Sequence, residues 1–514
     1  MWASILALCL VNLHLSSALS GEEIAKQLRS SLSPESGIYL PNDTEWQSKV
    51  LQPWNQWKAP VFKLSVKPNE QQDVQKVIQY AKKQKIPFFT VGGGHGYSET
   101  RSKCKDGIQI DMGNFKSVFV DAEKNTLTIG GSVRFSELAG PVYAAKKSIV
   151  VGTCSCVGMA GATLGGGIGF YSGFYGAISD SLISVSMISG SGDIVTASET
   201  ENSDLLWGMR GAGFNFGAVT SLTYKVYDSP NEGNALNTDM LFPISQNGSV
   251  WEVVKGYFEN HPKELSIAVG LLFDATAKQV IMVVNTIYVG SLDEGTALLK
   301  PLFDLSPLNA NSTYLPWKDV PDAALFGGIA QNCLVRPFYV PYTATLHAVD
   351  VNKMIRTVNY VNATIPKDSR LQTSLVTFTQ YSSWGFEQRP ANFSSFPHRT
   401  QAIFAQVDGI AKSASDAPTV SSFGSRVRDL LLQDTAPNSL IPASDDASGD
   451  EPSNSDNIAS AAPPAKRMEP VYTHFAHGDE GPEAWYSPEN LPHLRELKKR
   501  FDRDGLFRFY NPIS

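Results

Sequence analysis

The sequence predicts an α+β fold built from two units, because two stretches of the chain show different patterns of apolar residues. From about residue 60 to 228, short apolar runs alternate with segments of helical periodicity. From about 229 to 430, strand-like runs mix with amphipathic stretches, which is typical of an antiparallel sheet flanked by helices. The length of 514 residues suits more than one domain, since a domain takes roughly 100–200 residues.

The first unit opens with a helix and a buried strand. Within 67–83, Val74, Val77, Ile78 and Ala81 recur at helical spacing, and the apolar run 86–91 that follows favours a strand. The further elements expected are strands at 107–112 and 126–131, a helix at 135–147 despite Pro141, a hairpin at 182–198, a short helix at 204–211 capped by Ser203, and a strand within 215–227.

The second unit is expected to hold four strands and three helices. The strands are predicted at 266–273, 279–289, 374–381 and 400–410, and the helices at 249–261, 351–361 and 420–433. Residues 434–465 are rich in Ser, Asp, Pro and Ala and predict a flexible insertion. Residues 466–514 are expected to be folded again.

The amino terminus has the pattern of a secretory leader over residues 1–20. An apolar run ends in small residues, with Ala18 and Ser20 at the −3 and −1 positions of a cleavage site. No later stretch reaches 18 apolar residues, so no membrane span is expected in the mature chain. Secretion predicts glycosylation at five Asn-x-Ser/Thr sequons: Asn42, Asn247, Asn311, Asn362 and Asn392.

Charge and cysteine content narrow the function classes. With 43 Lys+Arg against 50 Asp+Glu, the net charge is −7, which argues against nucleic acid as a partner. Four cysteines remain after the leader, too few for a disulfide framework in so long a chain. A bridge between Cys104 and Cys333 is one pairing that the sequence leaves open.

Two glycine-dense loops are the strongest functional signal. Nine glycines fall within residues 152–176, interleaved with apolar side chains, and a second cluster spans 92–96 around His95. Glycine lets the backbone approach a ligand closely, and the N–H groups of such loops suit a pyrophosphate. The spacing matches neither a Walker A loop nor a Rossmann turn, and no metal-binding or serine-hydrolase motif is present.

These loops carry a family resemblance. Residues 91–112 and 150–169 resemble the two flavin loops of FAD-linked oxidases that share the vanillyl-alcohol oxidase and cresol methylhydroxylase fold. The FPHR sequence at 396–399 and the tail are similar to the berberine bridge enzyme-like branch. The resemblance implies a two-part FAD-binding PCMH-type domain at 58–228 after a segment at 21–57. It also implies a substrate domain at 229–433 and a carboxy-terminal segment, 466–514, that returns to the FAD domain.

The resemblance also implies how FAD is held. In that branch the histidine of the first loop bonds the flavin 8α-methyl carbon and a cysteine of the second bonds flavin C6; His95 and Cys154 stand at those positions. A proline usual after the cysteine is replaced by Ser155, and Cys156 offers a second thiol, so the identity of the bonding thiol stays open. Cofactor contacts are further expected from Gly92, Gly93, Gly94, Gly96, Thr153, Val157, Gly158, Gly161, Gly169 and Val195.

The resemblance leaves the catalytic base unassigned. Gln406 follows FPHR at the family's distance, but an amide cannot act as a base. Tyr381, Tyr472 and His474 are the candidates. A small residue such as Val157 goes with oxygen access to the flavin in this family, which favours an oxidase that reduces O2 to H2O2.

Four functions remain in competition. The leading hypothesis is a secreted oxidoreductase that transfers a hydride from a small organic molecule, a fungal secondary metabolite, to covalent FAD, with oxidative cyclisation among the reactions open to it. A carbohydrate oxidase would need an aromatic platform, for which Trp251, Trp317 and Trp384 are available. A non-redox cyclase or isomerase is the third, and a binding protein with a vestigial site is disfavoured by the intact loops. His95→Ala and Cys154→Ala are each expected to leave one flavin link, whereas Cys156→Ala is expected to change neither link.

Overall fold

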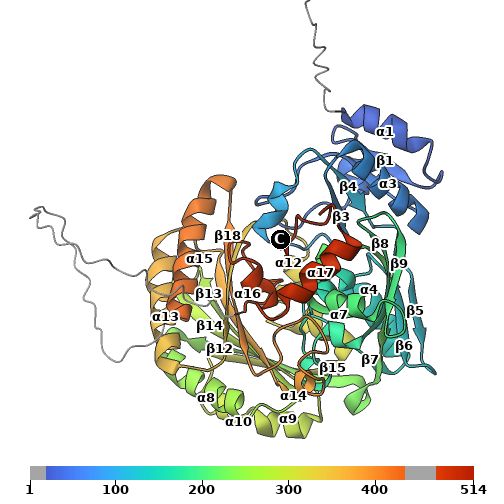
Figure 1. Cartoon of the computed structure of the whole chain (residues 1–514). Coiled ribbons are helices and arrows are strands. Elements are labelled where there is room, and N and C mark those ends of the chain that lie inside the picture. The colour runs from blue at the N-terminus through green and yellow to red at the C-terminus, as the bar shows by residue number, and fades with distance from the viewer. Residues whose placement is uncertain (1–18, 434–469, 514) are drawn as a thin grey trace, which may run out of the picture.

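The structure is a computed structural model that describes residues 19–433 and 470–513 (Figure 1). The leader up to residue 18 and the insertion predicted at 434–465 lie outside the described residues. No helix in the described ranges is both long and apolar enough to span a bilayer. The architecture is α+β, as predicted, with three main sheets.

A four-stranded sheet begins the amino-terminal half of the molecule. Three of its strands run parallel around a βαβ unit that encloses α3 (Gln71–Gln84), whose apolar face is buried against them. Helix α1 (Gly21–Arg29) starts with a capping box in which Ser20 and Glu23 satisfy each other's backbone N–H groups. The strand order is β1 (Gly37–Tyr39), β2 (Phe62–Lys67), β4 (Gly107–Asp111) and β3 (Phe88–Val91).

A five-stranded antiparallel sheet forms the second part of this half. Its strand order is β5 (Val118–Asp121), β6 (Thr126–Gly130), β10 (Gly217–Lys225), β8 (Leu182–Ser189) and β9 (Ile194–Ser198). The helices associated with it are α4 (Phe135–Ala144), α5 (Met159–Leu164), α6 (Ser172–Tyr175) and α7 (Ser203–Ala212). Helix α4 continues through Pro141, and α7 has Asn202 rather than Ser203 at its N-cap, because Ser203 already has helical geometry. A small pair, β7 (Lys147–Ser148) and β11 (Tyr227–Asp228), closes this half.

The other half is built on a seven-stranded antiparallel sheet. Its strand order is β15 (Asn309–Pro316), β12 (Asn234–Pro243), β14 (Gln279–Tyr288), β13 (Leu265–Asp274), β17 (Leu375–Tyr381), β18 (Ile403–Ala411) and β16 (Phe338–Leu346). One face packs on α8 (Asn247–Glu259), α13 (Val351–Thr364) and α15 (Ala417–Leu432), which form the outer layer in Figure 1. The shorter helices of the chain are α2 (Trp46–Lys49), α9 (Leu292–Leu298), α10 (Lys300–Phe303), α11 (Val320–Ala323), α12 (Gly328–Asn332) and α14 (Trp384–Glu387).

The opposite face of this sheet turns toward the glycine loops. Along β17 and β18, alternate residues are fully buried, while the residues between them, among them Thr377, Gln406 and Asp408, are only partly buried. Because successive strand side chains point to opposite faces, the buried set meets the helices and the partly buried polar set meets a cavity.

The carboxy-terminal tail packs back onto the amino-terminal half. Helices α16 (Pro482–Tyr486) and α17 (Leu491–Phe501) lie between the two halves in Figure 1. The buried side chain of Asn511 accepts a hydrogen bond from Ser98 Oγ at 2.6 Å and donates to the Thr473 carbonyl at 2.9 Å. Lys498 donates to the carbonyls of Asn215 and Phe507, so the last residues pack as part of the fold.

Candidate active site

One cavity of about 810 Å³ lies between the glycine loops and the polar face of the seven-stranded sheet. Pockets for small molecules and cofactors span about 300–1,000 Å³, so this volume suits a large ligand. The walls combine residues 92–97, most of residues 152–162, alternate residues of β17 and β18, and the tail residues Tyr472, His474 and Tyr510. All of these segments are far apart in the sequence, and only the fold brings them together.

The two glycine loops are in direct backbone contact. A Cβ on Gly93 would lie 2.6 Å from the Gly158 nitrogen, and a Cβ on Gly158 would lie 2.9 Å from the Gly93 Cα. By contrast, a Cβ on Gly161 would have no heavy atom within 4 Å, although Gly161 lines the cavity. Some glycines therefore let the loops pack together, whereas Gly161 leaves bare backbone open to a ligand, as an extended cofactor requires.

His95 lies at the cavity wall with its ring stacked on Trp54, the ring centroids being 5.5 Å apart. Burial, with a smaller contribution from the Arg134 charge, lowers the pKa of His95 to about 4. The imidazole is therefore neutral near pH 7, and one ring nitrogen keeps a free electron pair. That is the state in which a histidine acts as a nucleophile.

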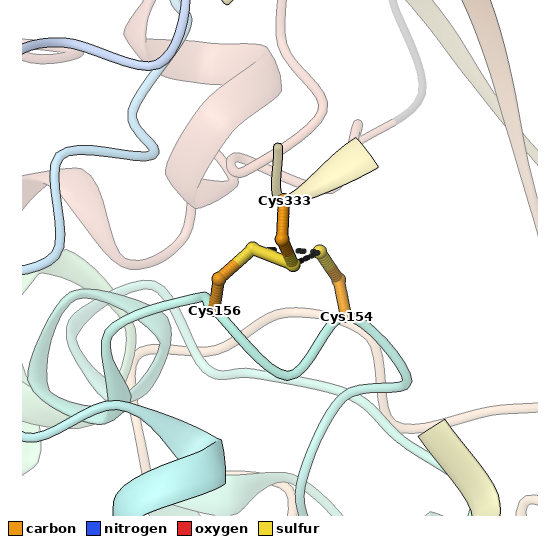
Figure 2. Close-up of side chains that lie close together, drawn as sticks. All are labelled: Cys154, Cys156 and Cys333. Atoms are coloured by element: carbon orange, nitrogen blue, oxygen red, sulfur yellow. Dashed lines mark hydrogen bonds between the residues drawn. A yellow bond between two sulfur atoms is a disulfide. The ribbon is translucent and has the colours of Figure 1, made fainter. Parts of the chain in front are cut away.

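Three sulfur atoms meet beside the second glycine loop, as Figure 2 shows. Cys156 and Cys333 are joined by a disulfide, with Cα atoms 5.8 Å apart, and Cys154 keeps its thiol. The Cys104–Cys333 bridge that the sequence left open is not formed in the structure, where Cys104 is a buried free thiol. Across the described ranges these three cysteines are the one group close enough for a metal, and the disulfide uses two of them.

The disulfide bears directly on the choice between Cys154 and Cys156. Cys154 lines the cavity, whereas Cys156 is buried and bonded to the other half of the molecule. Among the loop cysteines, Cys154 alone has a thiol. Cys156 also carries a structural link that the sequence did not reveal, since Cys156→Ala would break the disulfide and release Cys333.

The three candidate bases all line the cavity but differ in their surroundings. His474 Nε2 lies 2.7 Å from the Ala162 carbonyl, and burial lowers the pKa of His474 to about 4, which makes it a weak base. Tyr472 packs edge-on against Phe396 and His474, and burial raises its pKa well above the usual value. Burial likewise raises the pKa of Tyr381.

A carboxylate that the sequence did not single out completes the site. Asp408 lies two residues after Gln406 on β18, on the same cavity-facing side, and accepts a hydrogen bond from the Tyr339 hydroxyl. Gln406 donates to the hydroxyls of Tyr339 and, at 3.3 Å, Tyr97. Burial raises the pKa of Asp408 to about 6, so it titrates in the range where bases work. The sequence did hold a signal for Asp408, because residues two apart on a strand share a face and Asp408 lies two residues after Gln406.

Other predicted residues fall outside the cavity lining. Gly169 packs against the Val151 carbonyl, and Val195 lies in β9. The structure does not bring the three tryptophans together at the site, since Trp251 and Trp317 are buried in the two cores and Trp384 is exposed on α14. The remaining predicted cofactor residues, His95, Gly92, Gly93, Gly94, Gly96, Thr153, Cys154, Val157, Gly158 and Gly161, all line it.

Comparisons with known proteins agree with this geometry. Residues 62–198 match a family model described as an FAD binding domain, and residues 471–514 match one described as berberine and berberine like. The chain is 35% identical to the FAD-linked oxidoreductase azaL of Aspergillus niger over 96% of this chain and 98% of that protein. It is 33% identical to the FAD-linked oxidoreductase tazG of Aspergillus terreus over 94% and 93%.

Solved structures share the fold at lower identity. The BBE-like 1 protein of Physcomitrella patens has a TM-score of 0.77 at 19% identity, covering 95% of this chain and 99% of that one. A xylooligosaccharide oxidase from Myceliophthora thermophila has a TM-score of 0.76 at 20% identity, covering 96% and 99%. With the cavity, the matched domains and relatives of near-equal length, the chain belongs to the berberine bridge enzyme-like family of FAD-linked oxidoreductases.

Proposed function

We propose that this enzyme oxidises a small organic molecule by hydride transfer to covalently attached FAD, while Tyr339 and Asp408 accept the substrate's proton. The observation that carries this is the composition of the cavity. One wall holds the glycine loops with His95 and Cys154, and the opposite wall is a sheet face with Gln406 and Asp408. A cofactor held on the first wall would face a proton acceptor on the second.

Several residues fit FAD. Bare backbone at Gly161 and the stacked glycine loops leave room for an extended dinucleotide, and neutral His95 and the thiol of Cys154 are available for covalent bonds. When bound, FAD would supply the two-electron oxidant for this reaction. Two covalent links would hold its ring without a tight pocket, leaving space for a bulky substrate.

The proton route follows the hydrogen bonds. The Tyr339 hydroxyl donates to Asp408, so an ionised Asp408 can take that proton as Tyr339 accepts one from substrate. Gln406 holds the Tyr339 oxygen through a donated hydrogen bond. Above a pH of about 6 Asp408 is ionised, and the pair is ready to act as a base.

The substrate is proposed to be a small organic secondary metabolite rather than a sugar. The predicted tryptophan platform does not line the cavity, where Trp54 stacks on His95 instead. The fungal relatives carry the name FAD-linked oxidoreductase without a sugar substrate. Several solved neighbours are named for oligosaccharide oxidation, but at 20% identity or less they support the fold alone.

Molecular oxygen is the proposed electron acceptor, since Val157 lines the cavity with a small side chain. Secretion and glycosylation also remain part of the proposal. The sequon residues Asn42, Asn311 and Asn392 are exposed, while Asn362 is half-buried and Asn247 is buried.

One experiment tests the core of this proposal. The purified, denatured protein should stay yellow and carry a flavin mass addition on peptides that contain His95 and Cys154. Colour that washes away completely would reject the covalent bonds. Peroxide release during turnover of metabolites from the producing organism supports the oxidase, whereas product without oxygen consumption favours the cyclase or isomerase.

A further inference from the structure

The three sulfur atoms form a compact group that the flavin chemistry does not require. Cys154 Sγ lies 3.6 Å from Cys156 Sγ and 3.9 Å from Cys333 Sγ (Figure 2). A free thiol thus stands almost equally near both halves of a disulfide. Cys154 and Cys156 come from one loop, and Cys333 follows α12 in the other half of the molecule.

The disulfide ties the second glycine loop to a segment of the cavity wall. This wall segment, residues 325–337, contributes Leu325, Ile329, Asn332 and Val335 to the lining. Its start is held by Asp239, whose carboxylate accepts from the backbone nitrogens of Leu325 and Phe326 at 2.8 and 3.0 Å.

The far end of the wall segment is held by the amino-terminal arm. Trp54 Nε1 donates to the Asn332 carbonyl at 2.8 Å, and the Gln56 nitrogen donates to the Pro337 carbonyl at 2.9 Å. These contacts keep Cys333 near the loop whether or not it is bonded to Cys156. Cys333 can therefore change its partner without a large movement of the wall segment.

We propose that Cys154, Cys156 and Cys333 form a thiol–disulfide exchange triad, in which Cys154 can displace either half of the bridge. The Cys154 thiolate attacks Cys333 Sγ, the Cys154–Cys333 bond forms, and the Cys156–Cys333 bond breaks. Cys156 leaves as a thiolate and takes up the proton that Cys154 released, so no external oxidant is needed. Attack on Cys156 Sγ instead yields a Cys154–Cys156 bond and releases Cys333 as the thiol.

Burial slows this exchange. The pKa of the Cys154 thiol is raised by burial, so little thiolate is present at neutral pH and exchange is slow. The bridge between Cys156 and Cys333 accordingly persists, and it leaves Cys154 free. Holding the sulfurs within 4 Å compensates for the scarce thiolate, since proximity replaces an encounter in solution.

The triad has a consequence for the cofactor, and this part rests on the proposed function. A Cys154 bonded to flavin cannot exchange, and a Cys154 bonded to Cys333 cannot bond flavin. The Cys156–Cys333 bridge thus protects Cys154 from Cys333 until the cofactor is attached.

Removing Cys156 tests the exchange triad. In Cys156→Ala, equilibrated with oxidised and reduced glutathione, Cys154 and Cys333 should form a disulfide, with oxidised glutathione taking up the two electrons. Non-reducing digestion after alkylation should find these two peptides joined and should find the Cys154 flavin addition lost. In Cys156→Ala/Cys333→Ala, Cys154 has no partner and should regain the flavin addition or be alkylated.

A Cys156→Ala protein in which Cys154 and Cys333 are both alkylated, or in which Cys154 keeps its flavin beside a free Cys333, overturns the proposal. If Cys156→Ala does not fold, Cys333→Ala takes its place. In that variant a Cys154–Cys156 disulfide is expected, and alkylation of both Cys154 and Cys156 would contradict the proposal. If the wild type carries no flavin at Cys154, only the second flavin bond is rejected. The Cys154–Cys333 disulfide in the variant is detected from the joined peptides, without reference to flavin.

Discussion

The Arg399 guanidinium binds the Asp180 carboxylate through two parallel hydrogen bonds of 2.7 and 2.8 Å. Arg399 ends the FPHR sequence of the substrate half, and Asp180 lies in a turn just after the second glycine loop. Both side chains are at least nine-tenths buried. The ion pair therefore ties the flavin loop to the sheet that carries the proposed base.

Breaking this ion pair should destabilise the fold strongly. Asp180→Ala is expected to cost about 3–5 kcal/mol of unfolding free energy, because it leaves the Arg399 charge buried and unpaired. Urea unfolding measures the loss. The double variant Asp180→Ala/Arg399→Ala should lose clearly less than the sum of the two single variants, and additive losses would show that the two groups act separately.

The contrast between Gly93 and Gly161 separates packing from cofactor access. Gly93→Ala places a methyl group 2.6 Å from the backbone of Gly158, so it should lower the melting temperature. Gly161→Ala meets no protein atom and lies within a helix, where alanine is favoured by about 1 kcal/mol, so the fold should survive. Flavin content should nevertheless fall, because the methyl group enters the cavity.

Gly256→Ala is the matched control for Gly161→Ala. Gly256 lies in helix α8, is exposed, and also has open space at its Cβ position, but it does not line the cavity. It should keep both stability and flavin. Equal flavin content in Gly161→Ala and Gly256→Ala would show that the cofactor does not approach residue 161.

The rate of substrate oxidation should depend on Asp408. Since its pKa is about 6 and the ionised form is the base, kcat/KM should fall as pH drops below about 6. Asp408→Asn should remove this fall in kcat/KM at low pH and lower the rate by about 10²–10⁴-fold. Tyr339→Phe should also slow the reaction, whereas Asp304→Asn, which removes an exposed carboxylate on the surface, should not.

The same carboxylate has a predictable effect on stability. Its folded pKa of about 6 exceeds the unfolded value of about 3.9, so the folded state holds the proton more tightly and loses stability as pH rises between these values. Asp408→Asn removes that loss. Compared with its effect at pH 4, the substitution should stabilise the protein at pH 8, as thermal melts at both pH values would reveal; an effect independent of pH would contradict the raised pKa.

Substitutions of the two residues proposed to bond flavin should separate the two proposed links. His95→Ala should keep a flavin addition on the Cys154 peptide, and Cys154→Ala should keep one on the His95 peptide, each by mass spectrometry of the denatured protein. Cys104→Ala is the control, since that buried thiol does not line the cavity. Loss of all covalent flavin in His95→Ala would show that the Cys154 bond depends on the first.

Local pattern was sufficient for most elements and for the FAD-side wall of the site. The helical spacing around Val77 predicted α3, and the apolar runs predicted β3, β4, β8, β13, β14, β17 and β18. In the seven-stranded sheet, β12, β15 and β16 were missed. Of these, β15 is an exposed edge strand of mostly polar residues and β16 contains Pro341, so neither has a clear strand pattern.

What the sequence determined by itself was the pair of glycine loops with His95 and Cys154, because those signals are contiguous and their meaning is local. What only the tertiary structure decided was which residues oppose them. Asp408 gains its role from Tyr339, about 70 positions earlier, and from burial that no local pattern records. Likewise, Cys156 has no free thiol to offer a flavin, because it is bonded to Cys333, 177 residues away in the sequence. A disulfide depends on distance in space, which no local pattern records.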